Sequence, residues 1–156
     1  MEKYSHEAFA VTGLKISTSK LNNVDQKEIK ETWYKFMKEK IGDTIEGKLF
    51  PQFHAVYYNY KDQDNLKERS FDVILGFITD PTIKQKNPIL STLNIPAQDY
   101  MYETKVLDPK NMQKEIFELW EKINNLDNQI LPRIYGYDLE MYSEDKLTLT
   151  IAIAIK

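Results

Sequence analysis

Two segments of this chain repeat one pattern, and that internal repeat constrains the fold more than any other feature of the sequence. Residues 28–36 read EIKETWYKF and residues 115–123 read EIFELWEKI, so both follow Glu-Ile-x-Glu-x-Trp-x-Lys-apolar at an offset of 87 residues. The tryptophan of each segment falls on the apolar stripe of an amphipathic helix. Because 156 residues leave room for two such units, the repeat predicts a tandem duplication.

Both helices carry local start signals as well as an apolar stripe. The first is predicted over residues 23–40, where Asp25 suits a cap and Glu28 follows three residues later, as in a capping box. The second is predicted over residues 108–125, where Asp108 suits a cap and proline follows in the first turn. The repeated pattern therefore predicts two amphipathic helices, one in each half of the chain.

The segments around the helices are rich in aromatic and β-branched residues, which favour strands. One such segment precedes each helix and two follow it: residues 8–16, 52–60, 71–79, 99–106, 133–142 and 146–155. Short connections between consecutive strands favour antiparallel pairing. The linker, residues 81–96, contains three prolines and is predicted as loop. We therefore predict one α+β domain over residues 1–156, with antiparallel sheets and two β-α-β-β half-repeats at about 1–80 and 97–156.

Composition excludes several classes of function. The chain has no cysteine, so it has no disulfides or thiolate metal sites, and His6 and His54 lack a partner at ligand spacing. The net charge is −3 and the only arginines are Arg69 and Arg133, so a clustered basic face for nucleic acid is not expected. Neither a signal-peptide stretch nor an apolar segment long enough to span a bilayer is present. We expect a soluble, cytoplasmic protein without metal, cofactor, nucleic-acid or membrane partners.

The end of the chain, residues 133–156, reads RIYGYDLEMYSEDKLTLTIAIAIK and resembles the end of the GyrI-like family, also called the AraC-type effector-binding domain. Members of that family close with a strand of aspartate, an aromatic residue or leucine, glutamate, any residue and tyrosine. A short turn follows, and then a strand that ends in an apolar residue, proline or alanine, and another apolar residue. These motifs match residues 138–142 and 153–155, while Trp120 and the Ile-Pro pair at 95–96 match further family positions.

The resemblance covers nearly the whole chain, with two departures: Leu139, where phenylalanine is common, and Ala154, where many members have proline. It implies two SHS2-like halves related by a pseudo-twofold axis. Between them it implies an apolar, acidic groove for aromatic, often cationic, small molecules. It also implies the stand-alone form of the domain, because the chain begins almost at the first strand, without the helix-turn-helix domain of multidrug regulators.

Glu140 is the first candidate for the site. It lies in the middle of a predicted strand between Leu139 and Met141, in one of the most apolar parts of the sequence. A carboxylate near the floor of a groove is costly without a partner, and a lipophilic cation would supply one. The alternative interpretation is a solvated glutamate on the outer face. The match to the pocket glutamate of the family favours the site.

The other candidate ligand contacts are aromatic: Trp33, Trp120, Tyr58, Tyr137, Tyr142, Phe53 and Phe77. A tyrosine offers a flat apolar face and one polar tip, which suits a site for a flat ligand. Strand alternation puts Tyr142 on the same face as Glu140 and Tyr137 on the other, unless a bulge intervenes near Gly136. The tryptophans, Phe53 and Phe77 fit an ordinary core as well.

Three functions remain open on the sequence. The first is a binder of hydrophobic, cationic aromatic compounds that acts as a sensor or sink, and this is the reading that the resemblance favours. The second is a hydrolase of reactive aromatic electrophiles, in which Glu140 would orient or deprotonate water and a tyrosine would stabilise the leaving oxygen. The third is an inhibitor-type protein that interacts with gyrase.

Overall fold

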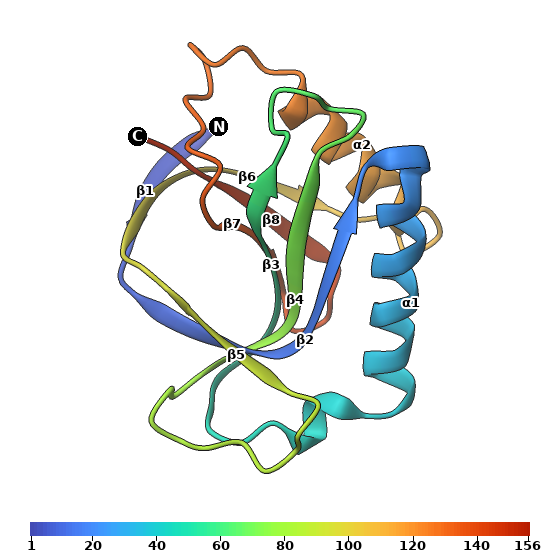
Figure 1. Ribbon diagram of the computed structural model, residues 1–156, viewed down its shortest axis with the longest axis vertical. Helices are drawn as coiled ribbons and strands as arrows, with labels where there is room; N and C mark the ends of the chain where they lie inside the picture. Colours follow the sequence, from blue (N-terminus) through green and yellow to red (C-terminus); the bar gives the residue numbers. More distant parts are fainter.

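The computed structural model describes residues 1–156 and shows one antiparallel sheet with two helices packed against one face (Figure 1). The helices are α1 (Val24–Lys38) and α2 (Met112–Asn124). The strands are β1 (Glu2–His6), β2 (Phe9–Ser19), β3 (Lys48–Lys61), β4 (Ser70–Thr79), β5 (Ser91–Ile95), β6 (Gln98–Val106), β7 (Asp138–Tyr142) and β8 (Thr148–Ala154). The predicted α+β fold with antiparallel strands is confirmed.

The order of the strands relates the two halves of the chain. From edge to edge the sheet reads β1-β6-β8-β7-β3-β4-β2-β5. In the first half β2 and β3 both pair with β4, and in the second half β6 and β7 both pair with β8. β3 pairs with β7 in the middle of the sheet, where the halves join. The strands β1, β2, β3 and β4 of the first half correspond to β5, β6, β7 and β8 of the second. Replacing each strand by its counterpart gives the same order read from the other edge, as a pseudo-twofold axis requires.

The two edge strands are exchanged between the halves. β1 precedes β2 in the chain but pairs with β6, and β5 precedes β6 but pairs with β2. Both ladders follow one register, since Glu2 faces Tyr102 and, seven residues further along, Phe9 faces Ile95. The segment from β1 to β2 therefore lies beside the segment from β5 to β6 along both ladders, and the sheet is strongly curled (Figure 1).

β5 lies within the linker 81–96, so the prediction of loop there is wrong for Ser91–Ile95. Proline prevents strand pairing only where its own missing N–H is needed. Pro88 and Pro96 lie on either side of the five strand residues and leave the N–H groups of that strand free to pair with β2. Tertiary pairing thus decides the conformation of a segment whose composition is typical of a loop.

The strand predicted over residues 133–142 is wrong in its first half. β7 covers only Asp138–Tyr142, and Arg133 makes a single bridge to Ile155. Between them Tyr135 has a φ of 53°, in the left-handed region, which interrupts extended backbone. This irregular approach to β7 brings Arg133 to one end of the site described below.

The start of α1 also differs from the prediction. The helix begins at Val24, and Asp25 is not its cap but a buried residue in the first turn. Glu28 accepts a hydrogen bond from the hydroxyl of Thr18 (2.9 Å) instead of closing a capping box. The first turn of α1 is therefore fixed by contacts with the preceding strand.

α2 begins at Met112, four residues later than predicted. Residues 108–111 form a separate turn, in which the N–H of Asn111 donates to the carbonyl oxygen of Asp108 (2.9 Å).

Neither helix has the length and apolar character that crossing a membrane requires.

Apolar side chains form two clusters, one on each face of the sheet. The cluster between the sheet and the helices contains Leu149, Ile151 and Ile153 of β8. The cluster inside the curl contains Ala152 and Ala154 of the same strand. Alternate residues of a strand point to opposite faces, so the central strands are packed from both sides. They provide a well-packed floor for the space between the helices.

Candidate ligand-binding site

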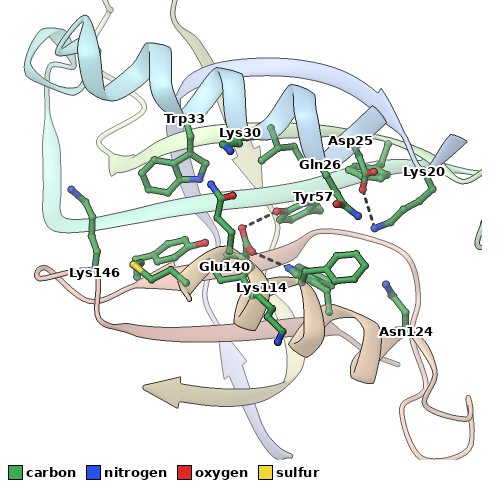
Figure 2. A pocket seen from close by; sticks show the side chains of 18 of the residues that line it. Lys20, Asp25, Gln26, Lys30, Trp33, Tyr57, Lys114, Asn124, Glu140 and Lys146 are labelled. Atoms are coloured by element: carbon green, nitrogen blue, oxygen red, sulfur yellow. Dashed lines mark hydrogen bonds and ion pairs between the residues drawn. The ribbon is translucent and has the colours of Figure 1, made fainter. Parts of the chain in front are cut away.

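A cavity of about 820 Å³ lies between α1 and α2, over the centre of the sheet (Figure 2). Each half of the chain supplies one helix to its walls, and its floor is formed mainly by β3 of the first half and β7 of the second, with Phe71 of β4. The apolar and aromatic residues that α1 and α2 contribute to its lining are Ile29, Trp33, Tyr34, Met37, Met112, Ile116, Phe117 and Trp120. The internal repeat thus places its two tryptophans on opposite sides of one cavity.

Glu140 lies on the floor of this cavity and is 2% exposed. One carboxylate oxygen, Oε1, accepts a hydrogen bond from the hydroxyl of Tyr57 (2.8 Å), and Oε2 accepts one from the indole N–H of Trp120 (2.8 Å) (Figure 2). No lysine or arginine forms an ion pair with it. The carboxylate is therefore held by two neutral donors, and its charge has no ion-pair partner in the protein.

The surroundings of Glu140 shift its ionisation. Burial raises the pKa of Glu140 above its ordinary value of 4.5, although the hydrogen bonds from Trp120 and Tyr57, the nearby hydroxyl of Tyr142 and the charge of Lys20 oppose that rise. Burial, together with the negative charge of Glu140, raises the pKa values of Tyr57 and Tyr142 well above their ordinary value. Both phenols consequently remain protonated hydrogen-bond donors at neutral pH.

The two tryptophans are wedged against other rings. Trp33 packs on Phe53, with 4.1 Å between ring centroids, and meets Tyr142 edge-on at 5.6 Å. Trp120 packs on Tyr57, at 4.9 Å. Each tryptophan is half-buried and lines the cavity, so one face rests on the core while the rest borders the open space.

Four of the predicted ligand contacts line the cavity and four do not. Glu140, Trp33, Trp120 and Tyr142 line it. Tyr58 and Tyr137 stack on each other at 5.8 Å in the cluster on the opposite face of the sheet. Phe53 is buried behind Trp33 in the cluster between the sheet and the helices. Phe77 packs against Phe53 in that cluster but does not line the cavity. The alternation that separates Tyr137 from Tyr142 is present as predicted.

Tyr57, which the sequence did not single out, occupies the place expected for Tyr58. Ala55 faces Glu140 across β3 and β7, and Tyr57 is two residues further along β3, so it lies on the same face as Glu140. Choosing between the adjacent tyrosines requires the register of two strands 83 residues apart, and no local pattern encodes that register.

A second carboxylate, that of Asp25, also lines the cavity. It is 3% exposed and forms an ion pair with Lys20, whose Nζ lies 2.9 Å from Oδ2 (Figure 2). The other oxygen, Oδ1, is buried without a hydrogen-bond partner. From the sequence Asp25 was a candidate helix cap, because its burial depends on the strand that ends at Ser19, just before Lys20.

Both arginines of the chain gather at one end of the cavity. Arg69 and Arg133 donate hydrogen bonds to the same oxygen, Oδ1 of Asn124, at 3.5 and 2.8 Å. Their guanidinium groups lie over the ring of Tyr135, at 4.9 and 4.5 Å from its centroid. Arg133 also forms an ion pair with the fully buried Asp138, at 2.8 Å. The scarcity of arginine was visible in the sequence, but not that its two copies meet.

The cavity is not acidic overall, so that expectation is wrong. Two carboxylates and seven basic side chains line it; the basic ones are Lys20, Lys30, Lys110, Lys114, Lys146, Arg69 and Arg133. Lys30, Lys110 and Lys114 are exposed, so water and salt screen them, whereas Glu140 is shielded from solvent. The electrostatic character of the site therefore changes from its floor to its rim and ends. No three His, Asp or Glu side chains come together as they would to hold a metal ion.

Comparison with known proteins identifies a family and structures of the same fold. A family model described as Cass2, integron-associated effector binding protein, matches residues 4–155. The fold is similar to that of the integron cassette protein VCH_CASS2 from the mobile metagenome of Vibrio cholerae, with a TM-score of 0.69 and 22% identity over 99% of this chain and 95% of that one. No curated protein sequence matches significantly.

Two further structures share the fold. SAV2435, solved with tetraphenylphosphonium bound, has a TM-score of 0.68 and 12% identity over 99% of this chain and 93% of that one. The C-terminal domain of EcmrR has a TM-score of 0.55 and 10% identity, over 99% and 96%. At such identities these likenesses establish the fold alone.

The curled sheet and the cavity between its helices define a small-molecule effector-binding domain with the GyrI-like fold. Because the family model matches nearly the whole chain, the protein belongs to the integron-associated effector binding proteins. The resemblance seen in the last two strands is thereby confirmed.

Proposed function

We propose that the cavity binds lipophilic aromatic cations, that Glu140 supplies the counter-charge, and that the protein acts as a sensor or sink for such compounds. The observation that carries this proposal is the state of Glu140: it is 2% exposed, accepts hydrogen bonds from two neutral donors and forms no ion pair. A buried carboxylate without a cationic partner is costly. A cationic ligand would remove that cost and gain affinity from it.

The aromatic walls support the same class of ligand. Trp33 and Trp120 border the cavity on either side of the carboxylate. An aromatic face within about 6 Å of a cation contributes about 0.5–2 kcal/mol, and more when water is excluded. SAV2435, which shares this fold, binds tetraphenylphosphonium, a cation enclosed by four phenyl rings.

Binding is favoured over hydrolysis by the hydrogen bonds of Glu140. A general base must reach the water that it activates, directly or through one intermediate. Here both carboxylate oxygens already accept bonds from Tyr57 and Trp120, which leaves one lone pair on each and lowers the basicity of the carboxylate. The hydrolase and the gyrase-binding alternatives stay predictions from the sequence.

The test is calorimetric titration with tetraphenylphosphonium and with triphenylphosphine oxide, a neutral analogue. We expect Glu140→Gln to weaken binding of the cation at least tenfold, about 1.4 kcal/mol. Binding of the neutral analogue should change by less than about twofold, because the substitution keeps the shape of the side chain.

Glu144→Gln is the matched control, because Glu144 is exposed in the turn after β7 and loses the same charge. It should bind the cation as the unmodified protein does. If Glu140→Gln keeps full affinity for tetraphenylphosphonium, or if Glu144→Gln loses as much, the counter-charge role of Glu140 is wrong.

A further inference from the structure

The charge at the arginine end of the cavity is not balanced. Arg69 is 3% exposed and Arg133 is 8% exposed, and both line the cavity. One buried carboxylate, that of Asp138, accompanies the two guanidinium groups, and it is bonded to Arg133. Arg69 forms no ion pair, and burial, followed by the neighbouring positive charge of Arg133, lowers the pKa of Arg69. One buried positive charge is therefore left without a counter-ion.

The carboxylate of Asp138 is occupied by other donors and makes no bond to Arg69. Its Oδ2 accepts bonds from Arg133 (2.8 Å) and from the hydroxyl of Tyr60 (2.7 Å), and its Oδ1 accepts one from the backbone N–H of Ala154 (2.9 Å). Asn124, which both arginines share, is neutral. Asp138 thus balances the charge of Arg133 and leaves the charge of Arg69 without a counter-ion.

The donors of Arg69 are only partly used. Its guanidinium donates to the carbonyl oxygen of Gln63 (2.6 Å), to Tyr135 (3.3 Å) and, at 3.5 Å, to Asn124. The Nε atoms of Arg69 and Arg133 are both buried with no hydrogen-bond partner. Leaving a buried charged donor unpaired is costly, and arginine pairs of this kind match the planar geometry of carboxylates and related oxyanions.

We infer that the arginine end is a subsite for an oxyanion substituent, a carboxylate or sulfonate, of the ligand whose cationic part lies against Glu140. The inference rests on the proposed function, in which Glu140 on the floor of the cavity binds the cation. Asn124, which binds both arginines, is four residues after Trp120, which binds Glu140, so the two anchoring residues lie about 6 Å apart along α2. The preferred ligand is then a zwitterionic aromatic compound that spans both ends.

The space at this end extends further. An adjoining hollow of about 540 Å³ shares Lys20, Trp120 and Asn124 with the cavity. Neither arginine lines this hollow, so an oxyanion beside the arginines lies within the main cavity. Neutralising the arginine pair should abolish the preference for an acidic group without affecting recognition of the cation.

The test compares rhodamine B, a cationic dye with a free carboxylate, with its ethyl ester, which keeps the cation and lacks the acid. Fluorescence titration gives the ratio of the two dissociation constants, ester over acid. We expect the unmodified protein to bind the acid about tenfold more tightly, and Arg69→Gln to bring the ratio to about one.

Asn124→Asp is the second variant, because it keeps both arginines and the shape of the side chain but adds the missing negative charge. It should also bring the ratio to about one, and circular dichroism should show an intact fold for it even if Arg69→Gln unfolds. Lys84→Gln, which removes an exposed lysine remote from the cavity lining, is the charge-matched control and should keep the tenfold ratio.

Glu140→Gln separates the two proposals. It should weaken both dyes and leave their ratio unchanged. If the ratio is about one in the unmodified protein, or survives Asn124→Asp, the anion subsite is wrong. If the ratio depends on Arg69 and Asn124 while Glu140→Gln leaves the ester unaffected, the subsite stands and the cation proposal falls. Failure of both dyes to bind would count against both.

Discussion

Ala55 lies directly opposite Glu140 where β3 and β7 join the two halves of the chain. Facing residues of an antiparallel pair point to the same side of the sheet, with Cβ atoms about 5 Å apart. The methyl group of Ala55 is fully buried beside the carboxylate. A small side chain here leaves Glu140 accessible to a ligand from the cavity.

We expect Ala55→Val to lower the free energy of unfolding by about 1–3 kcal/mol, since overpacking a well-packed site costs that much. The added methyl groups should also displace Glu140 and weaken binding of tetraphenylphosphonium. Denaturant unfolding and titration measure the two effects. Ala97→Val adds the same bulk at an exposed position and should change neither. Unchanged stability and affinity in Ala55→Val would contradict the packing described for this junction.

Affinity for a cation should rise with pH. Burial raises the pKa of Glu140 in the free protein, and a bound cation favours the ionised form, so binding should release protons above pH 4.5, the ordinary value. Affinity then increases as pH rises through the raised pKa and levels off above it. Tyr57 and Tyr142 have pKa values well above this window and do not contribute.

Titration calorimetry in buffers of different ionisation enthalpy measures this proton release. Glu140→Gln should bind tetraphenylphosphonium with an affinity that no longer changes across the window. A pH-independent affinity in the unmodified protein would mean that Glu140 is already fully ionised at the acid end, contrary to the effect of its burial.

Tyr57→Phe should damage the site, whereas Tyr58→Phe should not. Removing the Tyr57 hydroxyl deprives Oε1 of Glu140 of its donor, which costs about 1–3 kcal/mol for a buried charged acceptor. It should also raise the pKa of Glu140 further and move the pH curve for cation binding to higher pH. Tyr58 is the matched control, because it points to the opposite face of the sheet. Equal effects of the two substitutions would contradict the register of β3 and β7.

Lys20→Gln should separate stability from cation affinity. The substitution leaves the buried carboxylate of Asp25 without its ion-pair partner, so thermal unfolding should occur at lower temperature. It also removes a positive charge that acts on Glu140, so the affinity for tetraphenylphosphonium should rise a few-fold. Lys27→Gln breaks only an exposed pair with Glu31, worth about 0–1 kcal/mol, and should leave both quantities unchanged. A fall in cation affinity on Lys20→Gln would contradict the idea that the charge of Lys20 opposes binding of a cation at Glu140.

Local signals were enough for the helices and for the first site residue. The repeated Glu-Ile-x-Glu-x-Trp pattern located α1 and α2, and the motif around Glu140 located the floor of the cavity. Strand alternation also put Tyr137 and Tyr142 on opposite faces. These features depend on residues a few positions apart, which a sequence displays directly.

Features that depend on distant pairing were out of reach. The choice of Tyr57 over Tyr58 follows from the register of β3 with β7. Arg69 and Arg133 meet through Asn124 although 64 residues separate them. β5 forms because β2 offers it an edge. The residues next to them in the sequence do not indicate which distant residues they contact.

The exchange of β1 and β5 means that neither half of the chain is self-sufficient. Each half lends the strand that covers the outer edge of the other. Removing residues 1–6 would replace the five-residue edge strand β1 by the nine-residue β6, and a longer edge offers more unpaired N–H and C=O groups to strands of other molecules. The first few residues, far from the cavity, thus reduce the tendency of the protein to associate with itself through its sheet edge.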